Sequence, residues 1–362
     1  MKWLAALAAS ALLAGCATPT VESAQTDQSA VTPMPPALGG PAMAEVFDGT
    51  ALRVIMCGTS SPLPDANRAK ACTVVVAGDK AFVIDTGSES WEQLARMQFP
   101  GVKIAAVFLT HFHSDHIGDL GEFRMQTMVA GRAKMLPVYG PPGVKRVVEG
   151  FNAAYDLDAH YRLAHHGPAV INLAAAPLVA REFGTTFKGD LTGEEVVMQD
   201  GDLKVTAFEV DHDPIRPAVG YRFDWKGRSV VISGDTGKCQ NLVENARNAD
   251  VLVSESLSQT LIGIGQRQMT VTGNTRIAKI MGDIVDYHAS PVEAAQMAND
   301  AGVRLLVYTH HVPSAQVNMP AYFAGVAAVR PADQWVVGWD GLRIDLPVGS
   351  KDVKQGELLP KP

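Results

Sequence analysis

The segment at residues 111–116 contains three histidines and an aspartate within six positions, and it constrains this chain more than any other feature. Neutral imidazole and ionised carboxylate are the ligands that zinc and similar divalent metals prefer. The preceding residues 104–109 are apolar and partly β-branched, which predicts a short buried strand. The first two histidines can face the same way off that strand, while the aspartate and the last histidine turn toward a neighbouring position. The segment therefore predicts a fold that holds two adjacent metal ions at a strand end.

Several polar residues along the chain lie at or shortly after the end of an apolar run. The set is Asp85, His111, His212, Asp235 and His310. A single aspartate after a strand is usually a turn or helix-cap residue, and a single histidine is usually a satisfied partner. Rigid sheets, however, position the loops on which functional sites are built. We therefore expect these residues to meet at one end of a sheet.

The remaining pattern predicts one α/β domain over residues 51–349. Predicted strands and helices alternate, but several strands connect by hairpins, such as the turn at Gly78 and Asp79. This arrangement predicts mixed sheets covered by helices. A length of about 300 residues is enough for one large domain. Residues 350–362 are polar, and we expect a disordered tail.

The first sixteen residues resemble a bacterial lipoprotein signal. Lys2 supplies a positive charge, an apolar stretch too short to span a membrane follows, and small residues precede Cys16. This predicts export and an outer-membrane lipoprotein facing the periplasm, held to the membrane by a lipidated Cys16. The alternative is an ordinary signal peptide cleaved near Ala17, which gives a soluble periplasmic protein. Residues 17–50 have the composition of a flexible tether.

Charge and cysteine content add further constraints. The net charge is −7 and there is no basic block, which argues against nucleic acid as a partner because its binding draws on clustered Lys and Arg. Cys57 and Cys72 could lie on neighbouring strands and pair, or they could be two small buried thiols. Cys239 could be a soft metal ligand or a residue packed at the start of a helix.

Further motifs surround the histidine segment in a fixed order. They occupy residues 57–62, 84–87, 210–212, 217–222, 233–236, 287–290 and 306–310. With these motifs the chain resembles the metallo-β-lactamase superfamily, in the branch that holds the tRNA-processing ribonuclease Z and certain arylsulfatases. The resemblance implies an α/β fold of four layers, an αβ/βα sandwich of two mixed β-sheets flanked by helices.

The resemblance also implies a set of metal ligands, which divides into two triads and a bridge. The first metal would bind His111, His113 and His212, the second would bind Asp115, His116 and His310, and Asp235 would bridge them. The implied cofactor is two Zn²⁺, with Mn²⁺ or Fe²⁺ as alternatives. His310 is preferred over His311 because the ligand of this family directly follows a strand ending in Thr.

Three residues are candidates for catalysis. Asp115 could orient the attacking water or accept its proton while it ligates a metal. His288 could donate a proton to the leaving group, and Glu255 would orient it and raise its basicity. The alternative for His288 is a purely structural residue before a helix capped by Ser290. Asp85 is expected to brace the metal ligands rather than to bind metal.

The chain departs from the ribonuclease Z pattern in two places. Only residues 223–233 separate two motifs between which ribonuclease Z carries a long arm that grips tRNA. The motif after the bridging aspartate, residues 254–257, keeps its glutamate but lacks the usual histidine. An extra stretch at residues 151–167 could form part of a lid, placed at 144–190, or could be a solvated helix and loop.

These observations favour an exported binuclear hydrolase that acts on small molecules through a hydroxide shared by two metals, with β-lactams as candidate substrates. The alternatives are a phosphodiesterase or arylsulfatase of the ribonuclease Z-like branch, and a lactone or ester hydrolase. A non-enzymatic metal-binding lipoprotein is a further alternative. The expected partners are a small-molecule substrate, the membrane and a second copy of the chain, with no nucleic acid.

Overall fold

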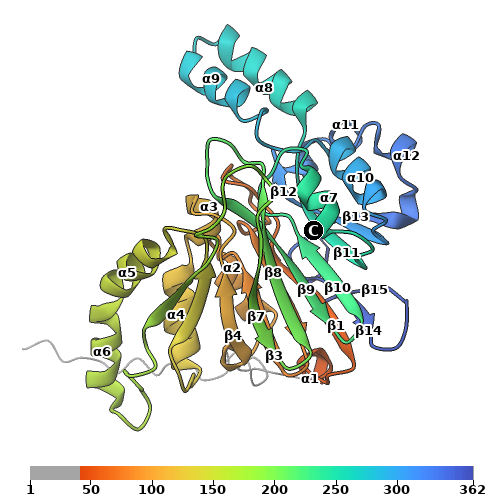
Figure 1. Ribbon diagram of the computed structural model, residues 1–362. Coiled ribbons are helices and arrows are strands. Elements are labelled where there is room, and N and C mark those ends of the chain that lie inside the picture. The colour runs from red at the N-terminus through yellow and green to blue at the C-terminus, as the bar shows by residue number, and fades with distance from the viewer. Residues whose placement is uncertain (1–40, 362) are drawn as a thin grey trace, which may run out of the picture. The chain divides into compact units, whose positions relative to one another are not determined.

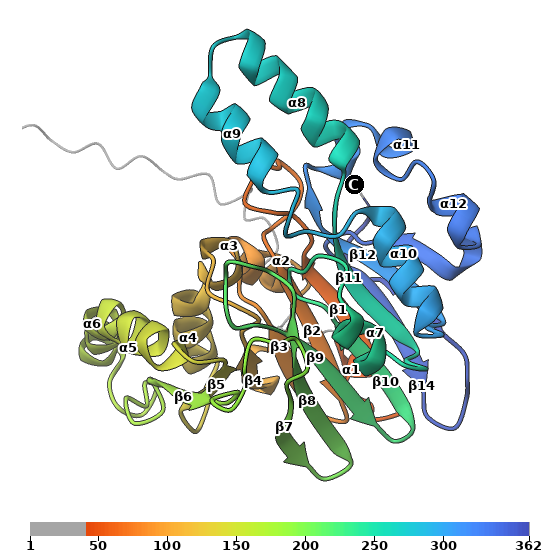
Figure 2. The same cartoon turned by 45° about the horizontal axis from the view of Figure 1, so that its top comes forward.

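The computed structural model of the chain describes residues 41–361, and Figures 1 and 2 show them as coloured ribbons. The predicted lipoprotein signal, its lipidation site and most of the predicted tether lie outside these residues. The end of the tether prediction is wrong, because Pro41–Val46 forms helix α1. Val46 is buried against the first sheet, and its carbonyl accepts a hydrogen bond from the Arg53 guanidinium, which together order this helix.

The first sheet has eight strands. In spatial order they are β15 (Lys354–Glu357), β14 (Leu342–Pro347), β1 (Ala51–Gly58), β2 (Cys72–Ala77), β3 (Lys80–Ile84), β4 (Ile104–Phe108), β5 (Leu136–Gly140) and β6 (Leu178–Glu182). The strands from β15 to β3 pair antiparallel and those from β3 to β6 pair parallel. The predicted hairpin turn joins β2 to β3, with Gly78 at φ 67, a backbone conformation that glycine adopts without strain.

The second sheet has seven strands. In spatial order they are β13 (Trp335–Val337), β12 (Leu305–Val312), β11 (Val251–Leu257), β10 (Arg228–Ile232), β9 (Ala218–Trp225), β8 (Leu203–Val210) and β7 (Glu194–Asp200). β10 to β13 are parallel and the others antiparallel, so this sheet is also mixed. Only the turn residues Lys226 and Gly227, both at positive φ, lie between β9 and β10. No arm is therefore inserted at this point.

Helices flank both sheets, and several of them cover the outer faces. Their bounds are α2 (Ser90–Arg96), α3 (Ser114–Ile117), α4 (Leu120–Val129), α5 (Val144–Ala154), α6 (Asp156–His166), α7 (Gln240–Asn245), α8 (Gln259–Val271), α9 (Thr275–Asp283), α10 (Pro291–Asp300), α11 (Met319–Tyr322) and α12 (Val326–Val329). Apolar residues of α2, α4 and α5 pack on the first sheet, and those of α7, α10 and α12 pack on the second. No helix among the described residues is long and apolar enough to cross a membrane.

The main core lies between the two sheets. Phe108 of the first sheet contacts Tyr221 and Phe223 of the second, with ring centroids 5.3 and 5.5 Å apart. All three side chains are buried, and each contributes about 1.5–3 kcal/mol by leaving water. Helix, sheet, sheet and helix thus form four layers (Figure 1), which confirms the predicted α/β sandwich.

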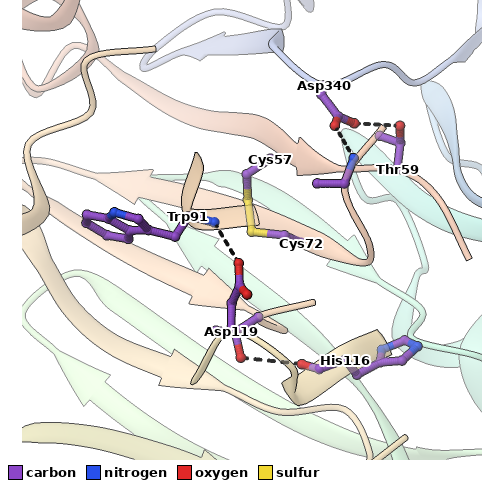
Figure 3. The surroundings of a disulfide bond; sticks show 9 residues. Cys57, Thr59, Cys72, Trp91, His116, Asp119 and Asp340 are labelled. Atoms are coloured by element: carbon purple, nitrogen blue, oxygen red, sulfur yellow. Dashed lines mark hydrogen bonds between the residues drawn. A yellow bond between two sulfur atoms is a disulfide. The ribbon is translucent and has the colours of Figure 1, made fainter. Parts of the chain in front are cut away.

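Cys57 and Cys72 form a disulfide between the end of β1 and the start of β2 (Figure 3). The third cysteine of the described residues, Cys239, is a buried thiol at the start of α7 and lies outside the metal cluster. The sequence left open whether Cys57 and Cys72 pair or are two buried thiols, and the structure shows that they pair.

The prediction of a disordered tail is wrong over part of residues 350–362. Strand β15 pairs antiparallel with β14, so its backbone groups join the edge of the first sheet. The following Leu358 and Leu359 pack partly buried on the outer core of that sheet. Polar side chains do not prevent a strand here because backbone hydrogen bonds, rather than side-chain burial, hold an edge strand.

The segment 144–190 contains α5, α6 and β6. Strand β6 hydrogen-bonds to β5 along its whole length, so this part of the expected lid is a fixed edge of the sheet. The polar side chains of α6 pair within the helix, Arg162 with Asp158 and His160 with Asp156. Helix α6 is therefore a solvated helix, as one alternative proposed, and its histidines do not join the metal cluster. Closure of the remaining segment over the site stays a prediction.

Candidate metal centre

The predicted ligands come from both sheets and meet at one end of the sandwich. The loop after β4 and helix α3 carry the histidine segment, while the other residues follow β8 and β10 or lie within β12. The structure gathers His111, His113, Asp115, His116, His212, Asp235 and His310. All but His113 are buried.

Four residues form a first group, in which the potential ligand atoms all lie within 4.8 Å of one another. The group is His111, His113, His212 and Asp235. His111 Nε2 lies 2.8 Å from His113 Nδ1 and 3.9 Å from Asp235 Oδ2, and His212 Nε2 lies 4.0 Å from the same oxygen. The group contains the ligands implied for the first metal together with the bridging aspartate.

Asp115, His116 and His310 form a second group of the same kind. Asp115 Oδ2 lies 3.0 Å from His310 Nε2 and 3.6 Å from His116 Nε2. Asp235 lies against both groups, because its Oδ2 is 3.3 Å from His116 Nε2 and its Oδ1 is 3.5 Å from His310 Nδ1. A carboxylate in this position can bridge two cations.

Several buried atoms of these ligands lack a hydrogen-bond partner among the described residues. They are His116 Nε2, His212 Nε2, Asp235 Oδ1 and His310 Nδ1. An unsatisfied buried polar group costs about 1–3 kcal/mol, so their convergence is unfavourable unless a ligand binds them. Divalent cations bind such lone pairs, and a set of imidazoles and carboxylates without thiolates fits an open zinc site rather than a closed structural one. The residues present therefore fit two metal ions.

Neighbouring residues orient the imidazoles. Asp85, after β3, accepts hydrogen bonds from the backbone N–H and the hydroxyl of Thr110, and its Oδ2 lies 2.8 Å from His116 Nδ1. His212 Nδ1 lies 3.0 Å from the carbonyl oxygen of Tyr287. Both contacts leave Nε2 of the ring directed at the cluster, as is usual for metal-ligating histidines. Asp85 therefore braces the cluster and does not belong to either ligand group.

For His111, His212 and Asp115 the electrostatics favour the protonation states that bind metal. Burial alone would lower the pKa of His116, but the neighbouring Asp235, Asp85 and Asp115 carboxylates raise it well above its ordinary value. Burial lowers the pKa of His111 well below its ordinary value and that of His212 to about 4, so both rings are neutral at pH 7. Burial alone would raise the pKa of Asp115, but the neighbouring His116 and His310 lower it to about 2. Neutral imidazole and ionised carboxylate are the coordinating forms of these side chains.

His310 reaches the cluster through a β-bulge. On β12, Thr309 pairs with Glu255 and His311 pairs with Ser256, so His310 is an extra residue without a partner on β11. Its φ of 44° lies in the left-handed region, which non-glycine residues adopt at a cost of about 1–3 kcal/mol. The bulge separates the two adjacent histidines: His311 stays outside both ligand groups, and burial lowers its pKa to about 3.

Glu255 and His288 form a buried pair beside the cluster. Glu255 Oε1 lies 2.7 Å from His288 Nδ1 and accepts a hydrogen bond from the backbone N–H of Thr236, next to Asp235. Burial alone would lower the pKa of His288, but the Glu255 carboxylate raises it. A ring nitrogen of His288 also lies within 4.8 Å of ligand atoms of Asp235 and His310. The sequence did not predict that His288 lies close enough to be a metal ligand itself.

Two other features near the centre were missed by the sequence reasoning. The carbonyl of Tyr287 orients His212, and a backbone carbonyl leaves no signal in the residue type. A cavity of about 580 Å³ lies beside Phe112. Its lining is mainly apolar and includes Phe151, and Arg146 is the one cation in that lining. It exists because α5 packs across the histidine loop, which is a tertiary contact.

Comparisons with known proteins agree with this geometry. A family model described as a beta-lactamase superfamily domain matches residues 80–311. Ribonuclease Z of Mycolicibacterium gilvum is 35% identical over 301 residues, which cover 82% of this chain and 97% of that protein. Ribonuclease Z of Mycobacterium bovis is 34% identical over 298 residues, which cover 82% of this chain and 98% of that protein.

Solved structures share the fold. The short form of human tRNase Z superposes with a TM-score of 0.57 at 19% identity, covering 82% of this chain and 100% of its own. The metallo-β-lactamase fold protein YhfI of Bacillus subtilis gives a TM-score of 0.56 at 19% identity, covering 82% and 99%. At this identity the likeness supports the fold alone.

The predicted main function, the small-molecule substrate and the exclusion of nucleic acid are wrong. The sequence favoured an exported hydrolase of small molecules, including β-lactams, and excluded nucleic acid. The relatives that match along nearly their whole length are ribonucleases. The physical error lies in the charge argument, because the net charge of −7 describes the whole chain and does not set the sign of charge on a particular surface.

Independent observations now converge. Two mixed sheets flanked by helices carry seven histidines and aspartates that could hold metal ions at one end, and the family model and the relatives cover the same region. The chain belongs to the metallo-β-lactamase superfamily, in its ribonuclease Z-like branch.

Proposed function

We propose that this chain is a zinc-dependent phosphodiesterase of the ribonuclease Z type that cleaves RNA. The observation that carries the proposal is the complete ligand set in a chain matched by ribonucleases Z over 82% of its length. The two ligand groups lie on either side of Asp235, an arrangement suited to two ions rather than one. Such sites support in-line displacement at phosphorus.

The residues of the chain divide the work of hydrolysis. When bound, two divalent ions would supply Lewis-acid charge to a phosphoryl oxygen and to water. Oδ2 of Asp115 lies close to His310 and His116. Its Oδ1 has no hydrogen-bond partner within residues 41–361, so this oxygen can accept a proton from the attacking water. Glu255 holds Nδ1 of His288, so Nε2 can donate a proton to the leaving oxygen.

Purified full chain, reconstituted with zinc, tests this proposal on a 3′-extended tRNA precursor and on bis-p-nitrophenyl phosphate. We expect cleavage of both, with loss of activity after chelation and recovery when zinc is restored. Mass spectrometry of the native protein should find two zinc ions per chain. A metal-replete protein that cleaves neither substrate would contradict the proposal.

Export is a separate proposal, based on the sequence of residues 1–16. The disulfide between Cys57 and Cys72 supports it, because disulfides persist mainly in oxidising compartments. Fractionation of cells that express the full chain, beside a version starting at Met43, tests it. We expect the full chain outside the cytoplasm and the shortened chain inside. Equal cytoplasmic location of both would reject export without affecting the proposed chemistry.

A further inference from the structure

The segment between β11 and α10 forms an antiparallel hairpin of two helices, α8 and α9. In Figures 1 and 2 this hairpin extends away from the sheets on the side of the histidine loop. Its glycines allow the helices to approach closely, because a Cβ on Gly282 would lie 2.5 Å from Gln266 of α8. The sequence reasoning did not predict this hairpin of two helices.

Only the base of the hairpin packs on the domain. Ile262, Met281 and Ile284 join a small core with Leu257 and Val312. The outer half is exposed, and its tip residue Val271 has 84% of its surface in water. An element that buries so little apolar surface adds little to the stability of the fold. Packing on the domain therefore accounts for the base of the hairpin and not for its outer half.

The charge of the hairpin is opposite to that of the whole chain. Residues 259–283 carry three cations and a single carboxylate, and that carboxylate, Asp283, pairs with Lys279 at 2.7 Å. Arg267 and Arg276 are exposed and have no carboxylate partner within residues 41–361. Arg276 lies in the first turn of α9, where the helix dipole disfavours a cation. Two unpaired guanidinium groups on a projecting element match the phosphates of a polyanion.

Both ends of the hairpin lie next to Glu255 and His288, the proposed catalytic pair. The chain leaves β11 two residues after Glu255 and returns at His288, and the side chains of these residues meet at 2.7 Å. Backbone hydrogen bonds from Leu257 to Ala289 and from Ala289 to Thr236 fix the two ends. A polymer held on the hairpin would therefore lie next to the metal centre.

We propose that the α8–α9 hairpin is an RNA-binding arm, on which Arg267 and Arg276 contact phosphates of the substrate at a distance from the scissile bond. This inference rests on the proposed function of the metal centre. The arm contributes to binding of a polymeric substrate and not to the chemical step, since neither arginine belongs to the ligand groups or to the Glu255–His288 pair.

The test compares the full chain with its R267E/R276E variant. Fluorescence anisotropy in the presence of a chelator measures binding of a labelled 3′-extended tRNA precursor without cleavage. Steady-state kinetics with zinc then measure KM for that RNA and kcat/KM for bis-p-nitrophenyl phosphate. K351E/K354E is the matched control, because it makes the same charge change at two exposed lysines on and beside β15. These lysines lie at the end of the first sheet opposite the metal centre, where Lys354 pairs with Asp345 of β14.

We expect R267E/R276E to weaken RNA binding at least about tenfold and to flatten its salt dependence, because each arginine that neutralises a phosphate releases counterions. Activity on the small diester should stay within about twofold in both variants, since that substrate is too short to reach the arm. R267K/R276K should keep most of the RNA affinity, because it retains both charges. The control should bind RNA like the unmodified chain.

Other outcomes overturn the inference and separate it from the proposed function. If the unmodified chain cleaves RNA and R267E/R276E binds RNA equally well, the arm assignment is wrong while the function stands. If the chain cleaves the small diester but does not bind RNA, both the arm and the RNA substrate are wrong, and only the phosphodiesterase chemistry survives. If R267E/R276E loses RNA binding only because it dissociates a dimer in sedimentation, the hairpin is a protein interface instead.

Discussion

The metal centre and the α8–α9 hairpin differ in how strongly the structure constrains them. Each ligand of the centre is buried or held by a neighbour, and its backbone lies in a strand end, a loop between strands, the short helix α3 or a bulge. The hairpin has free cations, an exposed tip and contacts only at its base. The comparison indicates that chemistry requires fixed atoms, whereas binding a long flexible substrate requires reach and charge.

The largest effect should come from the residue between the two ligand groups. Among residues 41–361, Asp235 is the carboxylate that faces both groups, and we expect Asp235→Ala to lower kcat on RNA and on bis-p-nitrophenyl phosphate about 10³-fold or more. The exposed Asp202→Ala is the matched control and should remain active. Metal analysis of both variants should show zinc loss only in Asp235→Ala. Full activity of that variant would show that the cluster is not the catalytic centre.

Removal of metal should destabilise the fold at the centre. The unpaired atoms of His116, His212, Asp235 and His310 then have no partner, so chelation should lower the free energy of unfolding by about 3–4 kcal/mol when zinc is in large excess over its dissociation constant. Thermal unfolding with and without chelator measures this change. Asp235→Ala should show a much smaller response to chelator. An unfolding temperature that does not respond to zinc in the unmodified chain would contradict metal binding.

Glu255→Gln should have an intermediate effect. The amide keeps the shape of the side chain but not the charge that orients His288, so we expect kcat to fall about 10–100-fold for both substrates with KM nearly unchanged. A structural role alone would instead lower the unfolding temperature and leave kcat per folded molecule unchanged. This kcat effect would contrast with the KM effect expected from the arginines of the hairpin.

The smallest effect should come from the tip of the hairpin. Val271→Ala removes an exposed side chain, and we expect the free energy of unfolding to change by less than about 0.5 kcal/mol. Leu306→Ala, at a fully buried position of β12, should cost about 2–5 kcal/mol. Denaturant unfolding measures both. A large cost at Val271 would mean that the tip packs on something, and it would weaken the description of the hairpin as a free arm.

Much of the centre was readable from residue type and spacing. Histidines and aspartates after apolar runs predicted the ligands because parallel strands of a sheet end at a common edge. The bulge at His310 could not be predicted from the sequence. Two adjacent histidines give no signal for which of them is left unpaired with β11. The closeness of His288 to Asp235 was also missed, because it depends on the position of α10 against the second sheet.

The errors in the prediction of function and of the chain ends have a common physical cause. Net charge and polar composition average over the whole chain or over a whole segment. Arg267 and Arg276 belong to one projecting hairpin only because α8 and α9 pack against each other, and the polar tail becomes strand β15 only because β14 offers a free edge. Averages over sequence therefore missed two exposed arginines on one hairpin and an ordered edge strand.

The sequence by itself determined the fold family and the metal-binding residue types, because both depend on short-range patterns of apolar runs and coordinating side chains. The tertiary structure alone decided the separation of His310 from His311, the Cys57–Cys72 disulfide and the connection of a cationic hairpin to the Glu255–His288 pair. These features depend on which distant segments come into contact, and contacts between distant segments arise only when the sheets and helices pack together.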